Sequence, residues 1–133
     1  MKAVFLDTVG LIAVWDTSDQ WHEPADCAYQ ELIREGCRIL TTSFVLLECG
    51  NAAARRPYRH RVNALRQSLA DEGLLVEPTA DDVEAAWQAY NRGEAAQAGI
   101  VDHVSFVAMR RLGVTSVFSN DEHFAAAGFE TLF

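Results

Sequence analysis

The stretch that most constrains the fold is Lys2 to Gly10, where a short apolar segment ends abruptly on a carboxylate. Residues 3–6 are apolar without alternation, which favours a central strand of a parallel sheet, covered on both faces, over a half-exposed antiparallel strand. Asp7 is then the first residue beyond a buried strand. In open parallel α/β sheets ligands bind beyond the carboxyl ends of the strands, so Asp7 is either a candidate for chemistry or a helix cap.

The rest of the chain repeats this alternation of short strands with helices. Helical spacing of apolar residues predicts helices over 8–15, 25–35, 44–55, 58–70, 80–90 and 101–112, and short strands over 38–41, 74–76 and 114–118. Capping boxes are expected at Thr79–Asp82 and Ser119–Glu122, and Trp87 and Tyr90 are expected in the core. The sequence therefore predicts an α/β fold with a short parallel sheet, with residues 1–133 forming one domain.

Composition narrows the classes of function. The net charge is −8, with 19 acidic and 11 basic residues, which argues against a protein that holds nucleic acid by a broad basic surface. Five arginines nevertheless fall between residues 55 and 66, and this cluster could contact phosphates, form a solvated surface or seat an acidic partner. The three cysteines have no metal-ligand spacing and are expected to be reduced core thiols. No long apolar run or signal sequence is present, so a cytoplasmic protein without membrane contact is expected.

Four acids are predicted to meet at one edge of the sheet. Each helix of a right-handed strand–helix–strand unit starts where the preceding strand ended, which places Asp7, Glu48, Asp102 and Asp121 at the carboxyl edge. Carboxylates gathered so closely repel, and a divalent cation removes that repulsion. Oxygen ligands of this kind suit Mg²⁺ or Mn²⁺, and such a site suits metal-assisted cleavage of a phosphodiester. His103 and His123 flank two of the acids but are not expected to be ligands, because Mg²⁺ prefers oxygen.

Several motifs together resemble a family across essentially the whole chain. They are Leu6-Asp-Thr8, Leu40-Thr-Thr-Ser-Phe-Val-Leu-Leu-Glu48-Cys-Gly-Asn51, Val101-Asp102-His-Val-Ser-Phe-Val-Ala-Met109, Ser119-Asn-Asp121-Glu-His123-Phe124 and Ala127-Gly-Phe-Glu-Thr-Leu132. In order and spacing they resemble PIN-domain proteins, most closely the VapC-type toxin ribonucleases. The resemblance implies a three-layer α/β/α sandwich with a short central parallel sheet, and a metal-dependent endoribonuclease using Mg²⁺ or Mn²⁺. It also implies a cognate antitoxin that occludes the site, and a homodimer.

The resemblance also implies roles for individual residues. Asp7, Glu48, Asp102 and Asp121 match the family's acidic quartet, and we expect the three aspartates to hold the metal. Supporting polar positions correspond to three further residues, Thr8, Asn51 and Ser119. The segment 92–101 departs from the family pattern, with Val101 where Thr is common, which bears on substrate choice. We expect RNA to contact a subset of the arginine cluster, namely Arg55, Arg56 and Arg59.

Competing functions remain at this point. A haloacid-dehalogenase-type phosphatase would require a second Asp two residues after the first, where Val9 stands. A receiver domain would require a Lys near the last strand, yet the only lysine is Lys2. A catalytically silent PIN-like domain that binds protein or RNA is the alternative that remains.

Overall fold

The centre of the molecule is a parallel sheet of five strands. The structure is a computed structural model, and it describes residues 2–133. The strands lie in the order β3-β2-β1-β4-β5, and every neighbouring pair is parallel. The elements in chain order are β1 (Ala3–Leu6), α1 (Thr8–Trp15), α2 (His22–Arg34), β2 (Arg38–Thr42), α3 (Ser43–Ala53), α4 (Arg59–Asp71), β3 (Leu75–Val76), α5 (Ala80–Asn91), α6 (Glu94–Gln97), α7 (Ile100–Leu112), β4 (Ser116–Phe118), α8 (Glu122–Ala126) and β5 (Glu130–Thr131).

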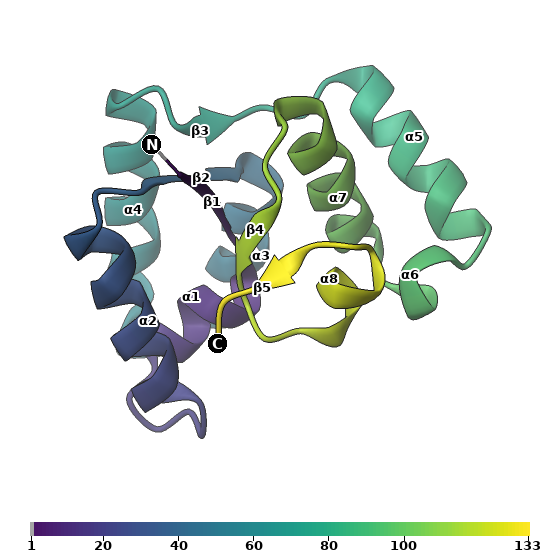
Figure 1. The fold of residues 1–133 in the computed structure, drawn as a ribbon. Helices are drawn as coiled ribbons and strands as arrows, with labels where there is room; N and C mark the ends of the chain where they lie inside the picture. Colours follow the sequence, from purple (N-terminus) through teal and green to yellow (C-terminus); the bar gives the residue numbers. More distant parts are fainter. Residues whose placement is uncertain (1) are drawn as a thin grey trace.

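Helices cover both faces of this sheet. The chain moves outward from β1 to β3 and then returns across β1 to β4, so right-handed crossovers place the later helices on the opposite face from the earlier ones. Figure 1 shows α2 and α4 on one side of the strands and α5 and α7 on the other. The predicted three-layer α/β/α sandwich is therefore confirmed, and the reversal of strand order lies at the carboxyl ends of β1 and β4.

β1 is the middle strand, as its unbroken apolar sequence predicts. Val4, Phe5 and Leu6 are fully buried, and β1 pairs with β2 on one side and β4 on the other. The following helix approaches β4 closely at Gly10. A Cβ atom at that position would lie 2.1 Å from the carbonyl oxygen of Phe118, so the contact requires glycine. This packing fixes the start of α1 beside the end of β4.

Of two expectations about the α5–α7 pair, one is confirmed and one is wrong. The capping box at Thr79 and Asp82 is confirmed, and Asp82 also accepts a forked contact from Arg111 of α7. The expected burial of Trp87 and Tyr90 is wrong, because these side chains remain 49% and 46% exposed on α5. Helix α5 instead buries small residues against α7, and the two rings pack edge to face on its flank.

Two smaller expectations also need correction. The cap of α8 is Asp121, whereas the sequence favoured Ser119. Between α5 and α7 the chain forms the short turn α6, whose residues 95–97 all have positive φ angles. Of the three free thiols, only Cys49 is buried, while Cys27 is exposed. Between residues 2 and 133, no helix has both the length and the apolar character that a membrane crossing requires.

Candidate metal centre

Asp7 is both a helix cap and a member of the acidic site. It follows β1 directly, is 2% exposed, and accepts hydrogen bonds from the Val9 N–H at 3.3 Å and from the Ser119 hydroxyl at 2.9 Å. Burial raises its pKa to about 7, against the lowering effect of the Ser119 hydrogen bond, and the charges of Asp102 and Asp121 add to the rise. The two interpretations of this residue, cap and chemistry, are therefore compatible.

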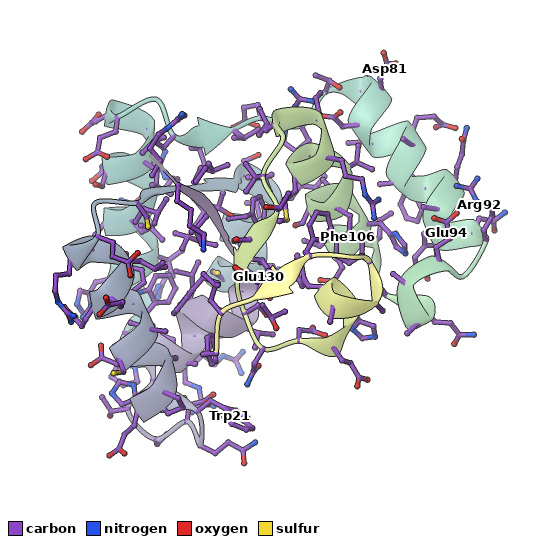
Figure 2. The ribbon with its side chains drawn as sticks, in the orientation of Figure 1. Trp21, Asp81, Arg92, Glu94, Phe106 and Glu130 are labelled. Carbon is purple, nitrogen blue, oxygen red and sulfur yellow. The ribbon has the colours of Figure 1, made fainter. Side chains whose placement is uncertain are left out.

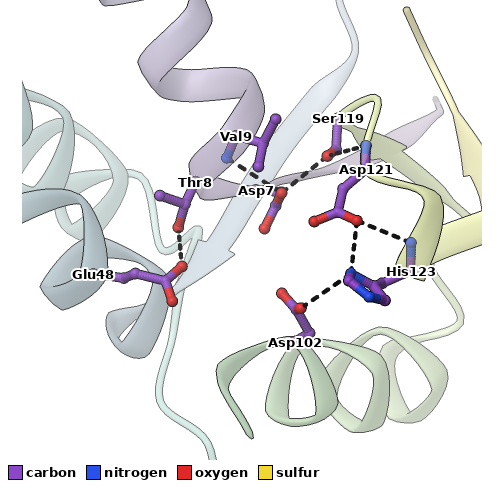
Figure 3. A network of polar contacts seen from close by, with 8 residues as sticks. All are labelled: Asp7, Thr8, Val9, Glu48, Asp102, Ser119, Asp121 and His123. Carbon is purple, nitrogen blue, oxygen red and sulfur yellow. Dashed lines mark hydrogen bonds and ion pairs between the residues drawn. The ribbon is translucent and has the colours of Figure 1, made fainter. Parts of the chain in front are cut away.

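Asp102, Asp121 and His123 form the most compact group of potential ligands. Asp102 lies in the first turn of α7, Asp121 is the N-cap of α8, and His123 lies in the first turn of that helix. One ligand atom from each residue falls within 4.8 Å of the others. Figure 3 shows the three side chains converging from the two helix starts, with Asp7 beside them. The predicted meeting of the acids at this edge is thus visible in the structure.

Ser119 connects Asp7 to this group. Its hydroxyl donates to Asp7, and its oxygen accepts from the backbone N–H of Asp121 at 3.1 Å. Ser119 is fully buried directly after β4, so it holds Asp7 and Asp121, the first and last acids of the quartet, in a fixed relation. The supporting role expected of Ser119 therefore has a specific geometry.

Glu48 reaches the same edge from α3. The Thr8 hydroxyl donates to Glu48 Oε1 at 2.5 Å, which ties the second turn of α3 to the first residue of α1. The pKa of Asp102 rises to about 6, mainly through burial and then through the charges of Asp121 and Glu48. These charge effects connect Asp102 with each of the other three acids.

The donor set fits a divalent cation. Desolvation raises the pKa values of the buried Asp7 and the partly buried Asp102, and the charges of neighbouring carboxylates add to the rise. A cation beside these carboxylates would favour their ionised forms, and oxygen ligands suit Mg²⁺ or Mn²⁺. Asp102 and Asp121 could bind it directly, whereas Asp7 adjoins the compact group through Ser119. Asp7 is therefore a candidate ligand with less direct geometry.

The remaining predicted residues lie outside the acidic group. Asn51 is exposed on α3, and it lines a shallow hollow of about 500 Å³ together with Arg55 and Arg56. Arg59 is exposed at the start of α4. The hydrogen bonds from Ser18 lower the pKa of Asp16 at the C-terminal end of α1, and the charge of Arg56 adds to this lowering. Asp7 caps the opposite end of the same helix.

Sequence reasoning set aside His123, which the structure brings to the centre of the group. Its Nδ1 atom lies 2.9 Å from Asp121 Oδ1 and 4.0 Å from Asp102 Oδ2. The sequence feature that could have indicated this position is that His123 comes two residues after the helix cap Asp121. In the first turn of α8 its ring then lies near the carboxylate of the cap. His103 is buried among aromatic rings, between Tyr90 and Phe106.

Comparisons with known proteins agree with this geometry. No family model matches the chain. A curated relative, the 23S rRNA-specific endonuclease VapC20 of Mycobacterium tuberculosis, is 29% identical over 127 residues, covering 95% of each chain. The crystal structure of VapC20, described as a sarcin-ricin loop cleaving toxin, superposes with a TM-score of 0.81 at 27% identity over 95% of each chain.

More distant structures share the fold. FitAcB from Neisseria gonorrhoeae gives a TM-score of 0.66 at 16% identity, covering 98% of this chain and 96% of that one. DNA-bound VapBC from Salmonella typhimurium gives 0.62 at 15% identity, covering 98% and 97%. At such low identities these two matches support the fold alone.

Proposed function

We propose that the chain is a VapC-type PIN-domain protein and acts as a metal-dependent endoribonuclease, the toxin of a toxin–antitoxin pair, given its similarity to VapC20. The observation that carries the proposal is the convergence of Asp7, Glu48, Asp102 and Asp121 at one sheet edge. A phosphodiester is the substrate class that such a site suits, because a cation held there can bind phosphate oxygens and polarise water.

The acids have separable roles in this proposal. Asp102 and Asp121 hold the cation, since they form the compact part of the group. Asp7 adds negative charge and is held in position by Ser119. Glu48 orients the attacking water and accepts its proton, while the Thr8 hydroxyl fixes one carboxylate oxygen and leaves the other available.

The substrate is single-stranded or looped RNA, because an unstacked strand can bend into a small site. VapC20 is named as specific for 23S rRNA, and the similarity makes structured ribosomal RNA the first substrate to test. The hollow lined by Asn51, Arg55 and Arg56 follows Glu48 along α3, and Arg59 stands just beyond it. In a chain of net charge −8, this local positive surface is suited to guide a phosphate backbone.

The protein partners are a cognate antitoxin and a second copy of the chain. Structures of similar fold include DNA-bound VapBC from Salmonella typhimurium and VapBC2 from Rickettsia felis. An antitoxin would restrain the nuclease by covering the acidic edge. The homodimer is proposed from the family relationship.

The test is cleavage of total RNA and of ribosomal fragments by the purified chain, free of partner, with Mg²⁺ or Mn²⁺. Asp7→Asn and Glu48→Gln should each lose cutting, and EDTA should abolish it. Glu84→Gln is the matched control, because Glu84 is an exposed acid on α5 outside the site. Absence of cleavage by the folded wild type under every metal would instead support a silent binding domain, and unchanged cleavage by both site variants would refute the assigned residues.

A further inference from the structure

The imidazole of His123 is an unusual member of an acidic cluster. Its Nδ1 atom faces two carboxylates, at 2.9 Å from Asp121 Oδ1 and 4.0 Å from Asp102 Oδ2 (Figure 3). The three ligand atoms lie within 4.8 Å of one another. This spacing allows a single ion to contact all three, since metal–ligand bonds of about 2.0–2.3 Å separate neighbouring ligand atoms by about 3–4.5 Å.

The Nδ1 atom has no hydrogen-bond partner among residues 2–133. It is shielded from solvent, and its contact with Asp121 Oδ1 is short but lies outside hydrogen-bond geometry. The same Asp121 oxygen is already occupied, because it accepts a well-formed bond from the His123 backbone N–H at 2.9 Å. A buried polar atom without a partner requires an explanation, and a bound ion is one of the recognised explanations.

We propose that Asp102, Asp121 and His123 Nδ1 together form a mixed nitrogen and oxygen site that selects a divalent transition ion over Mg²⁺. The proposal rests on the proposed metal site, but it is independent of RNA cleavage. Mg²⁺ binds through oxygen and keeps several waters, whereas imidazole nitrogen favours later transition ions such as Co²⁺, Ni²⁺ and Zn²⁺ over Mg²⁺. His123 thus distinguishes this site from an all-carboxylate one, in which Mg²⁺ would meet only its preferred ligands.

The opposing interpretation is that the ring serves as a cation in place of a metal. A positively charged imidazole between Asp102 and Asp121 would neutralise them and would compete with any incoming ion. The two interpretations predict opposite effects when the ring is removed. Loss of a ligand weakens transition-ion binding, whereas loss of a competing charge strengthens the binding of every divalent ion.

The experiment measures binding of Co²⁺, Mn²⁺ and Mg²⁺ to the metal-free full chain by calorimetry at fixed pH, with no RNA present. His123→Asn replaces the ring nitrogen with an amide at a similar position, and Glu122→Ala is the control on the exposed side of the same turn. We expect His123→Asn to weaken Co²⁺ binding about tenfold or more, with Mg²⁺ nearly unchanged. Glu122→Ala should leave both affinities unchanged.

A second readout on the wild type guards against a variant that does not fold. Pulsed electron paramagnetic resonance of the Mn²⁺-loaded protein should show coupling to one ¹⁴N nucleus of an imidazole. Absence of nitrogen coupling would overturn the proposal, as would tighter binding of all three ions by His123→Asn. Neither readout uses RNA. If the protein does not cleave RNA, the result on metal selectivity therefore still stands, and if His123 is not a ligand, the nuclease proposal still stands.

Discussion

Replacing Asp7 with Asn should stabilise the metal-free protein at alkaline pH. The pKa of this carboxyl rises from an ordinary value of 3.8 to about 7 through burial, so ionising it in the folded state is unfavourable. At about 1.36 kcal/mol per pKa unit, the full cost of ionising Asp7 above pH 7 is of the order of 4 kcal/mol, and local relaxation reduces it to about half of that. Asn keeps an oxygen that can accept from Val9 N–H and Ser119, without the charge.

The sign follows from proton binding. Between pH 3.8 and 7 the folded state holds the proton that the unfolded chain has released, so wild-type stability falls across this window and is constant above it. The stability advantage of Asp7→Asn should therefore be greatest at pH 8 and fall by more than half at pH 5. The assay is urea unfolding in EDTA at both pH values, with Glu84→Gln as the control on an exposed acid. An equal advantage at both pH values, or a less stable variant at pH 8, would refute the reasoning.

Three other changes test the structure. Gly10→Ala should destabilise the fold by about 1–3 kcal/mol, measured by urea unfolding, because the added Cβ meets a β4 carbonyl oxygen at 2.1 Å. Ser119→Ala removes a bond that lowers the pKa of Asp7, so an infrared titration of that carboxyl should give a higher pKa than in the wild type. Replacing Arg55 and Arg59 with Ala should weaken RNA binding and flatten its dependence on salt, and an unchanged salt slope would exclude both as phosphate contacts.

The fold was predictable because its signals are local and repeated. An unbroken apolar strand such as β1 requires cover on both faces, and each polar cap marks where a helix begins. The exposure of Trp87 and Tyr90 could not be predicted in the same way. Helical spacing shows that the two rings share a face of α5. The packing of α5 against α7 uses small residues and the Asp82–Arg111 pair, and it leaves the face with the two rings partly exposed. Figure 2 shows α5 along the margin of the molecule.

The candidate site was predictable at the level of its carboxylates and not at the level of its complete ligand set. The edge rule places any residue that follows a parallel strand, which is sufficient for Asp7 and Asp121. The direction of a ring in the first turn of α8 depends on which residue caps that helix. If Ser119 capped α8, the helix would begin earlier and His123 would not be expected beside Asp102. Because Asp121 is the cap, the ring of His123 lies next to Asp102 and Asp121.

The corrected cap has a further consequence for how the site is held together. Asp121 uses Oδ1 to cap α8 through the His123 N–H, and its own N–H is held by Ser119, which also holds Asp7. The same short segment thus starts a helix and fixes the spacing of two potential ligands. Because strand ends and helix caps position these carboxylates, cation binding should stabilise the fold by linkage.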